Sequence, residues 1–333
     1  MQQALARRVS YWLNWPLVPP SKLILLLTHR CPVACEFCST HRWAAARPRE
    51  LTLVELEARL AEAASWGIRE VLFSGGEPLL RRTDVLALTR AARALGMIPT
   101  LITSGAVGGT ATLEALVEAG MASFMVSLDG NCAETHDRLR GRVGSFDEAI
   151  AWLAGAVELR ERLGAPALPY TVYVQTVVTR ENVAEIVALA ERVRELGVDA
   201  ILFQGLAPDA YLAAHPFDAR ALAALAEAIE RLARIEPRSL VMNPDGYLRE
   251  LLGFYGERDR IQPKRCPAGF DTLVLAPDGS VSTCRESFTR EILGEGGEPL
   301  TLREAWTHRR FQAARRTMRV CKEPCTINCW YSS

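Results

Sequence analysis

Short apolar runs alternate with longer helical stretches between about residues 22 and 205, and this pattern constrains the fold more than any other feature. Six runs have the length and composition of buried strands, at residues 23–28, 70–74, 97–103, 124–129, 170–178 and 200–205. Strands that alternate with helices form parallel sheets with right-handed crossovers. Six such units fit either an open doubly wound sheet or a partial barrel. No GxGxxG follows the first strand, so a dinucleotide-binding fold has little support.

Local signals place the ends of the helices between these strands. We expect three capping boxes, in which an N-cap residue is followed three positions later by an acid: Thr52 with Glu55, Ser145 with Glu148, and Asn182 with Glu185. Five helices are expected to end at a glycine, at Gly67, Gly96, Gly120, Gly164 and Gly197.

The pattern changes after about residue 207. AHPFDARALAALAEAIERLARIE predicts one long amphipathic helix, LREAWTHRRFQAARRTMR predicts another that is capped by Thr301 and Glu304, and LVLAPDGSVSTC predicts two short strands around a turn at Asp278. The boundary falls loosely near 240–262. The expected organisation is an N-terminal amphipathic segment at 1–21, a main α/β domain at 22–240 and a C-terminal extension at 241–333.

Composition excludes several classes of protein. Lys+Arg and Asp+Glu both number 39, which gives no basic excess for a nucleic-acid partner. No apolar run is long enough to predict a transmembrane helix, and the first twenty residues contain no secretory apolar region, so we expect a cytoplasmic, reducing environment. The stretch ARRVSYWLNW is amphipathic; it either touches a membrane surface or, as we favour, forms a helix that packs on the protein body.

Eight of the nine cysteines fall into two groups, one near each end of the chain. The first group is Cys31, Cys35 and Cys38, and the second is Cys266, Cys284, Cys321, Cys325 and Cys329. Clustering of this kind in a reducing compartment points to metal rather than to disulfides. Cys132 stands alone and is expected to be structural.

The first group, in THRCPVACEFCST, offers three thiols with Cys-x3-Cys-x2-Cys spacing. Tetrahedral zinc takes four ligands, which His29 or His41 could complete. A [4Fe–4S] cluster held by three thiolates instead leaves one iron open for an outside ligand that carries an amine and a carboxylate.

These residues resemble the radical S-adenosylmethionine (SAM) superfamily. Phe37 precedes the third cysteine, and four further matches follow in the order and strand context of that family: GGEP at 75–78 after the second strand, SLDG at 127–130 after the fourth, HDRLRG at 136–141, and Asn182 after the fifth. The resemblance covers roughly residues 22–205.

The resemblance implies a fold, a cofactor and a reaction. The fold is a partial (β/α)6 TIM-like barrel of the α/β class, with the cluster at the carboxyl ends of the strands. SAM binds the open iron, and one electron cleaves it to methionine and a 5′-deoxyadenosyl radical, which abstracts hydrogen from a substrate.

The resemblance also implies cofactor contacts at particular positions. Gly75, Gly76 and Glu77 of the motif that ends at Pro78 contact the SAM amino group, Ser127 and Asp129 line the ribose side, Arg140 pairs with the carboxylate, and Phe37 lies against adenine. A surface ion pair is the alternative for Arg140. The family pattern often has Asn in the middle of Thr103-Ser104-Gly105, where the hydroxyl of Ser104 can still hydrogen-bond. We assign no catalytic acid or base, and only Arg285 and Glu286 are candidates.

The second cysteine group predicts zinc and iron–sulfur equally well on spacing alone. Beside a radical SAM core, however, it resembles the SPASM/twitch extension, a small α+β domain that holds auxiliary [4Fe–4S] clusters. Five cysteines rather than the seven of the full SPASM pattern favour one such cluster, with Cys266, Cys284 and two of the three terminal cysteines as ligands.

Two hypotheses for the partner and substrate follow. The basic helix before the terminal cysteines either docks an acidic electron donor such as flavodoxin or ferredoxin, or is an ordinary solvated surface. The substrate is expected to be a peptide or a small molecule, such as a natural-product or cofactor precursor, and the net reaction is either redox-neutral or oxidative.

The function predicted from the sequence is therefore that of a radical SAM oxidoreductase. The alternatives are a non-catalytic iron–sulfur protein for electron transfer or sensing with a vestigial SAM site, and a zinc-binding protein. GGEP also occurs at 296–299, but there it follows a polar loop and leads into the Thr301 cap, so we expect only the copy at Gly75 to contact SAM.

Overall fold

The computed structural model describes residues 2–38, 40, 49–164, 170–206, 210–243, 246–257, 268–283 and 299–319, with the backbone alone at 2–4, 210 and 319. Its centre is one eight-stranded sheet with the order β6-β5-β4-β3-β2-β1-β7-β8. The strands are β1 (Lys22–Leu26), β2 (Glu70–Ser74), β3 (Ile98–Thr103), β4 (Ser123–Ser127), β5 (Thr171–Val177), β6 (Ala200–Gln204), β7 (Thr272–Leu275) and β8 (Val281–Ser282). The six strands predicted from the apolar runs are confirmed, and all six pair in parallel in chain order.

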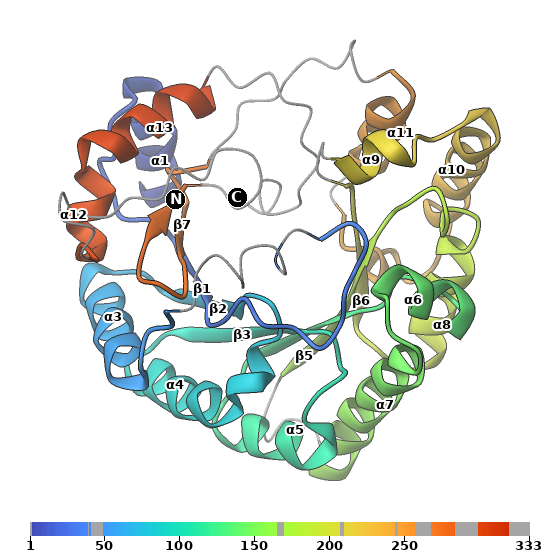
Figure 1. Ribbon diagram of the computed structural model, residues 1–333, viewed down its shortest axis with the longest axis horizontal. Coiled ribbons are helices and arrows are strands. Elements are labelled where there is room, and N and C mark those ends of the chain that lie inside the picture. Colours follow the sequence, from blue (N-terminus) through green and yellow to red (C-terminus); the bar gives the residue numbers. More distant parts are fainter. Residues whose placement is uncertain are drawn as a thin grey trace.

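Helices cover the outer face of the curved sheet (Figure 1). In the described part of the chain they are α1 (Gln2–Leu13), α3 (Leu53–Trp66), η1 (Pro78–Arg81), α4 (Arg82–Ala94), α5 (Gly109–Glu118), α6 (Ala133–Arg140), α7 (Ser145–Leu163), α8 (Ile186–Glu195), α9 (Ala210–Ala214), α10 (Ala219–Leu232), η2 (Arg238–Leu240), α11 (Tyr247–Gly256), α12 (Leu302–Thr307) and α13 (Arg309–Arg319).

The two faces of the sheet have different environments. In β5, Val172 and Val174 are fully buried and belong to the main hydrophobic core, whereas the alternate residues Tyr173 and Gln175 are only partly buried. Side chains on a strand alternate between faces. One face therefore packs against the helices, and the other lines an interior that keeps some access to solvent.

The predicted hairpin around Asp278 is confirmed, and it joins the main sheet. β7 pairs in parallel with β1, β8 pairs antiparallel with β7, and the Asp278 carboxylate accepts a hydrogen bond from the Ser280 backbone N–H at 3.0 Å in the turn. The strand order thus continues past β1 into the C-terminal part of the chain. The three-part division of the chain stays a prediction.

Two predicted helices are interrupted. The helix expected over residues 214–236 begins only at Ala219, because the Asp218 carboxylate accepts a hydrogen bond from the Ala221 N–H at 2.8 Å and caps it there. The helix expected before the terminal cysteines is two helices, because His308 between them has extended backbone.

The predicted helix ends are mostly confirmed. Both expected caps at Thr52 and Thr301 form capping boxes, and all five predicted glycines have positive φ. The boxes at Ser145 and Asn182 are wrong: Gly144 is the N-cap of α7, and Glu185 is that of α8.

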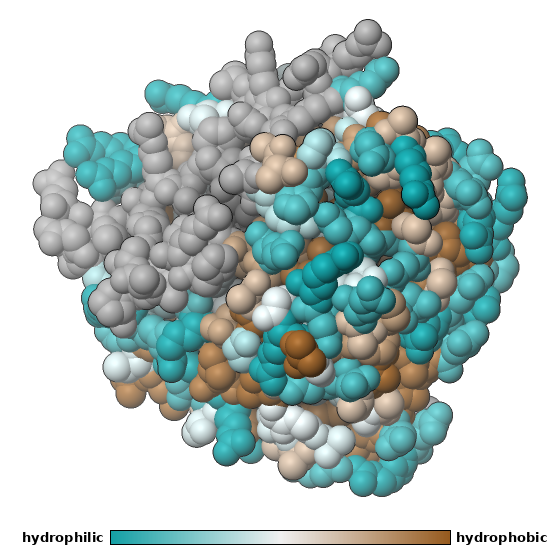
Figure 2. Space-filling model, turned by 45° about the vertical axis from the view of Figure 1, so that its right-hand side comes forward, coloured by the Kyte–Doolittle hydropathy of each residue, from teal (hydrophilic) through white to brown (hydrophobic). Residues whose placement is uncertain are grey.

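Hydrophilic side chains cover much of the described surface on the face shown in Figure 2, with hydrophobic ones between them. Among the helices of the described residues, none has the length and apolar character needed to cross a membrane.

Candidate functional site

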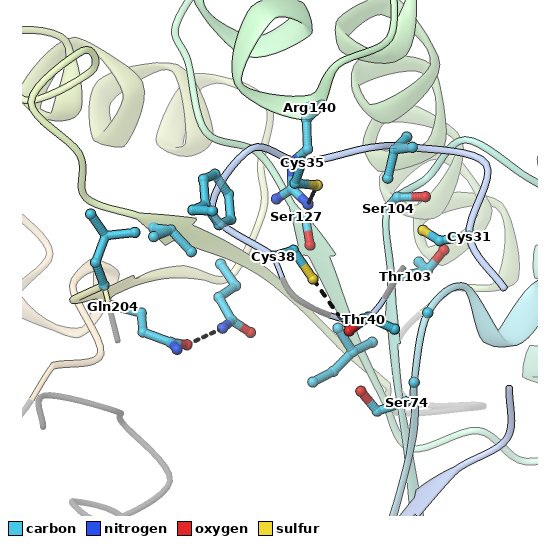
Figure 3. A pocket seen from close by; sticks show the side chains of 18 of the residues that line it. Cys31, Cys35, Cys38, Thr40, Ser74, Thr103, Ser104, Ser127, Arg140 and Gln204 are labelled. Atoms are coloured by element: carbon cyan, nitrogen blue, oxygen red, sulfur yellow. Dashed lines mark hydrogen bonds between the residues drawn. The ribbon is translucent and has the colours of Figure 1, made fainter. Parts of the chain in front are cut away.

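All three cysteines of the first group line one pocket at the carboxyl ends of the parallel strands. The cavity measures about 180 Å³, and strands β2 to β6 contribute to its walls. Figure 3 shows Cys31, Cys35 and Cys38 on the loop that follows β1, with hydroxyl and amide side chains of the strand ends facing the same space. The loops after parallel strands carry the chemistry in folds of this kind. The lining residues are Cys31, Val33, Cys35, Phe37, Cys38, Thr40, Ser74, Gly75, Gly76, Ile102, Thr103, Ser104, Ser127, Arg140, Gln175, Val177, Gln204, Gly205 and Leu206.

The end of α6 holds the cysteine loop in place. The backbone N–H groups of Ala34 and Glu36 donate to the last carbonyls of this helix, those of Arg140 at 3.0 Å and Leu139 at 3.3 Å. Gly141 follows with a φ of 62°, and a Cβ there would lie 2.5 Å from the Ala34 carbonyl oxygen. The HDRLRG segment therefore both ends a helix and clamps the loop that carries the cysteines.

The two glycines of the first GGEP copy pack directly under the start of the cysteine loop. A Cβ on Gly75 would lie 2.4 Å from the Thr28 carbonyl oxygen, and one on Gly76 would lie 2.1 Å from that of Arg30. The Gly76 N–H donates to Thr28 at 2.7 Å, and the Glu77 N–H donates to Arg30 at 2.9 Å. Glycine is required because the two backbones approach too closely for any side chain.

The Glu77 carboxylate is fully buried and joins the ends of β2 and β3. It accepts hydrogen bonds from the hydroxyl of Thr103 at 2.9 Å, from the N–H and hydroxyl of Ser104 at 2.8 and 2.6 Å, and from the Leu79 N–H at 3.1 Å. Burial raises the pKa of Glu77, and these four donors oppose that rise. Ser104 therefore hydrogen-bonds at the position where the family pattern often has Asn. Pro78 is buried beside Glu77, in the first turn of η1.

Arg140 links the barrel to the cysteine loop through a buried ion pair. Its Nη2 lies 2.6 Å from Asp129 Oδ2, and its Nη1 lies 3.5 Å from Cys35 Sγ (Figure 3). Arg140 is 8% exposed and Asp129 is fully buried, so the surface ion pair considered for Arg140 is wrong. The guanidinium also lies 5.9 Å from the centroid of the Phe37 ring. A cation is thus held beside a cysteine sulfur by a buried carboxylate.

Asp129 is held by the neighbouring strand and helix as well. Its Oδ1 accepts from the Val177 N–H at 2.8 Å, its carbonyl accepts from Asn182 Nδ2 at 2.8 Å, and its N–H donates to His136 Nδ1 at 3.0 Å. Burial, with Arg140 nearby, lowers the pKa of His136 to about 3, so this imidazole is neutral and can accept. Asn182 thus ties strand ends together rather than capping a helix.

Two of the three thiols, those of Cys31 and Cys35, are only weakly acidic in this surrounding. Burial raises the pKa of Cys31 to about 11 and also raises the pKa of Cys35, where Arg140 opposes the rise. A metal ligand must be a thiolate, so binding here would release protons. Among the described residues, no group of three His, Cys, Asp or Glu side chains is arranged closely enough to hold one metal ion.

Several lining residues were missed in the sequence. Gln175 and Gln204 hydrogen-bond to each other across the ends of β5 and β6, and both line the pocket with Ser127 and Phe37. A polar residue at the end of an apolar run, as in YTVYVQ and AILFQ, is the signal that could have identified them. The Phe37 ring also meets that of Tyr211 edge-on at 6.0 Å.

Several predicted residues lie outside the described part of the chain. They are His41, Cys266, Cys284, Arg285, Glu286, Gly296, Gly297, Glu298, Cys321, Cys325 and Cys329. His29 is buried, and Cys132 is exposed.

Comparison with known proteins finds similarity over the same region and beyond it. The family model for the radical SAM superfamily matches residues 25–162. A PqqA peptide cyclase from Ruegeria pomeroyi is 33% identical over 298 residues, covering 86% of this chain and 74% of that protein. A PqqA peptide cyclase from Methylobacterium sp. is 32% identical over 323 residues, covering 93% and 79%.

The solved structure of Streptococcus suis SuiB has a similar fold. It superposes with a TM-score of 0.68 at 18% identity and covers 95% of this chain and 72% of SuiB. SuiB bound to its precursor peptide SuiA gives a TM-score of 0.66. The parallel sheet expected from the strand–helix alternation and the partial barrel implied by the family resemblance are both confirmed.

Proposed function

Because this chain belongs to the radical SAM superfamily, we propose that its pocket holds a [4Fe–4S] cluster on Cys31, Cys35 and Cys38 and that it oxidises a peptide by hydrogen abstraction. When bound, such a cluster supplies one electron that cleaves SAM and yields a 5′-deoxyadenosyl radical. The observation that carries the proposal is the placement of three thiols over the polar ends of five strands, in one pocket.

The residues around the pocket fit these groups. A cation at Cys35 Sγ stabilises a thiolate ligand, and Arg140 is held there by Asp129. Gly75 and Gly76 line the pocket on the side of β2, where we place the SAM amino group, and the buried Glu77 and Pro78 follow them directly in the chain. Ser104 and Ser127 line the pocket on the side of β3 and β4, where we place the carboxylate and the ribose. Asp129, which was expected on the ribose side, is fully buried and pairs with Arg140 instead of lining the pocket.

Phe37 would lie against adenine, and Arg140 would contact the SAM carboxylate as well as the thiolate. Both side chains line the pocket, and they lie within cation–π distance of each other. Gln175 and Gln204, which hydrogen-bond to each other, line the pocket on the side of β5 and β6, where we propose that they orient a substrate.

A peptide is the substrate class that the relatives support. Both relatives carry the name PqqA peptide cyclase, and they cover most of this chain. The substrate would lose one hydrogen atom to the deoxyadenosyl radical and then one electron and one proton, so that the product has two hydrogens fewer. We also propose cytoplasmic location and an acidic electron donor such as flavodoxin or ferredoxin.

An auxiliary [4Fe–4S] cluster on the second cysteine group would accept the second electron. Described residues near that group in the sequence support it, because Arg315 is fully buried, has no acidic partner among the described residues, and leaves its Nη2 without a hydrogen bond. Two further buried donors, Thr283 Oγ1 and Trp306 Nε1, also lack acceptors in the described part of the protein. Thr283 directly precedes Cys284, and a thiolate-bound cluster is an anion with acceptor sulfurs.

Counting iron and sulfide under anaerobic conditions tests both clusters. With two clusters, we expect roughly eight irons in the wild type and roughly four in the variant with Cys31, Cys35 and Cys38 changed to Ala. A wild-type count near four, abolished by that triple change, would remove the auxiliary cluster and leave the first.

The substrate class is tested with the peptide encoded by a short open reading frame beside the gene. Deuterium placed in that peptide should appear in 5′-deoxyadenosine, and the peptide should lose two hydrogens by mass spectrometry. A peptide substrate would be contradicted if SAM were cleaved rapidly but no deuterium from any tested peptide appeared in 5′-deoxyadenosine.

A further inference from the structure

The N-terminal helix α1 presents its apolar face to solvent and its polar face to the protein. The large hydrophobic side chains on its outer face and on the segment after it are between 38% and 64% exposed: Leu5, Val9, Trp12, Leu13, Trp15 and Leu17. The helical members recur at spacings of three and four and so lie on one side. Surface helices normally bury such a stripe.

Polar residues lie on the inward side of α1, together with the ring of Tyr11. Ser10 is 1% exposed and Asn14 is 9% exposed, while Arg7 Nε lies 3.1 Å from Asp271 Oδ1. The Asn14 carbonyl also accepts a hydrogen bond from Gln312 of α13, which lies beside α1 (Figure 1). The orientation of α1 is therefore fixed by specific polar contacts, and the outward apolar stripe is part of the fold.

The exposed charged side chains of α1 and α13 in the described part of the chain are all positive. Helices α1 and α13 carry seven arginines between them and no acidic residue, although the whole chain has equal numbers of acidic and basic residues. Two of the seven do not add to the surface charge, because Arg7 pairs with Asp271 and Arg315 is fully buried. Arg8, Arg309 and Arg316 are exposed, and the last two share the face of α13 that carries Gln312. An acidic partner complements this surface, whereas a second copy of the same surface would be repelled.

The stripe is connected to the interior by aromatic and cationic contacts. The ring of Tyr11 on α1 meets Phe270 edge-on at 5.3 Å, and the Arg315 guanidinium lies 5.6 Å from the centroid of Phe270. Arg315 Nε donates to the Gly269 carbonyl at 2.7 Å, and a Cβ on Gly269 would lie 2.9 Å from Thr283 Cγ2. These contacts run from the surface to the residue that precedes Cys284. A membrane-binding surface would need no such connection to the second cysteine group. A redox partner would use a short path from the surface to that group.

We infer that α1 and α13 form the docking surface for an acidic electron-transfer protein. This inference rests on the function proposed above and adds the site at which the electron donor binds. The partner's acidic rim faces Arg8, Arg309 and Arg316, and its apolar centre covers Trp12, Leu13 and their neighbours. One electron leaves the reduced partner and enters the iron–sulfur system of this enzyme. Tryptophan and arginine are the side chains that most often dominate binding energy at protein interfaces.

The test compares two reductants on the full-length, reconstituted enzyme. Flavodoxin, an acidic protein, must dock, whereas dithionite needs no docking surface, and 5′-deoxyadenosine formation from SAM reports electron delivery by either. The first variant combines Leu5→Ser, Trp12→Ser and Leu13→Ser, and the second combines Arg8→Glu with Arg316→Glu. Matched controls are Val54→Ser with Val143→Ser, and Arg90→Glu with Arg231→Glu, which change exposed residues on other elements.

We expect both test variants to lose about tenfold or more in flavodoxin-driven formation while the dithionite-driven rate and both controls stay at the wild-type level. The affinity for flavodoxin, measured by titration calorimetry, should fall in parallel, and its salt dependence should weaken in the arginine variant.

Three results would overturn the inference. One is unchanged flavodoxin-driven activity in both test variants, and another is an equal loss with both reductants, which would show a structural role only. The third is loss of binding to phosphatidylglycerol vesicles with unchanged flavodoxin affinity, which would assign the surface to a membrane. If the wild type forms no 5′-deoxyadenosine with dithionite, the proposed function fails, and the calorimetry still decides the docking surface.

Discussion

At the scale of single residues, two buried carboxylates hold the walls of the pocket in different ways. Glu77 is surrounded by four neutral donors, whereas Asp129 is paired with the cation Arg140. The sequence placed both acids at strand ends, where parallel strands bring loops together. It did not indicate their partners, because the choice between Ser104, Arg140 and a ligand depends on register and side-chain direction.

The Asp129–Arg140 pair gives a first prediction. Changing Arg140→Gln should destabilise the fold by about 3–5 kcal/mol, because it leaves a buried carboxylate without its cation. Adding Asp129→Asn should recover part of that loss, because the remaining pair is neutral. Chemical denaturation of the two single variants and the double variant measures this coupling. Additive losses in the double variant would show that the ion pair carries no interaction energy.

The two GGEP copies give a second prediction. Glu77→Gln should reduce SAM cleavage at least tenfold, because the amide replaces an acceptor oxygen by a donor among four groups that all donate. Glu298→Gln should leave the rate within about twofold of the wild type, because its copy lies in a sequence context typical of a turn. Rates of 5′-deoxyadenosine formation measure both. Equal losses in the two variants would remove the distinction between the copies.

At the scale of elements, helix α7 shows how a cap can come from a neighbour. The Asp137 carboxylate on α6 accepts hydrogen bonds from the N–H groups of Gly144 and Phe146 at 2.6 and 2.8 Å, and from the Ser145 hydroxyl at 2.9 Å. The capping box expected within Ser145–Glu148 is therefore replaced by Asp137, an acid seven residues before the N-cap Gly144. The spacing of residues around a helix start therefore predicts a cap only when the capping side chain comes from that same stretch of sequence.

This cap predicts a dependence of stability on pH. Burial acts to raise the pKa of Asp137, but the donors from Phe146, Gly144 and Ser145 outweigh it and hold the pKa below its ordinary value. A lowered pKa contributes stability above the unfolded value of 3.8, and this contribution is lost as pH falls through the folded value. Asp137→Asn should thus cost about 1–2 kcal/mol at neutral pH and progressively less below about pH 4.

Urea denaturation of the wild type and Asp137→Asn across pH 3 to pH 7 measures this difference, with Asp147→Asn on the first turn of α7 as the control. A difference between wild type and Asp137→Asn that stays constant over the whole range would contradict the assignment of Asp137 as the cap.

The positions at which a long helix is interrupted were the hardest features of the secondary structure to predict. Ala214, Phe217 and Ala221 keep helical spacing across the first break, so period alone extends that helix too far. At His308 the spacing shifts, because Trp306 is followed by Phe311 after five positions. In the first case Pro216 and Asp218 were a visible signal of a helix start. At the second break, His308 Nδ1 accepts a hydrogen bond from the Arg310 N–H at 3.2 Å, and Trp306 and Phe311 on either side are both buried in the core.

At the scale of the whole molecule, the order of strands and the place of the cysteines could be predicted. Each strand follows its neighbour through one helix, so chain order becomes sheet order and the carboxyl ends converge. The pairing of β7 with β1 was not predicted, because it joins residues about 250 positions apart with no local signal. It matters for the site, since it places the hairpin that precedes Cys284 on the strand that precedes Cys31.

The outward apolar face of α1 also emerges only at this scale. The sequence predicted an amphipathic helix that packs on the protein body, and this is confirmed, but amphipathic helices normally pack through their apolar side. The contacts of Arg7 and Asn14 with distant residues reverse that orientation. The amphipathic periodicity of a helix thus predicts that it has an apolar and a polar face, but it does not predict which face packs against the rest of the protein.

The central claim is that the Cys31, Cys35 and Cys38 pocket cleaves SAM to 5′-deoxyadenosine. The direct measurement is 5′-deoxyadenosine formed from SAM and dithionite by anaerobically reconstituted protein, compared with the variant in which all three cysteines are Ala. We predict repeated turnover in the wild type and no product in the variant. No product from a wild type with its full iron content, or equal product from the triple variant, would contradict the account.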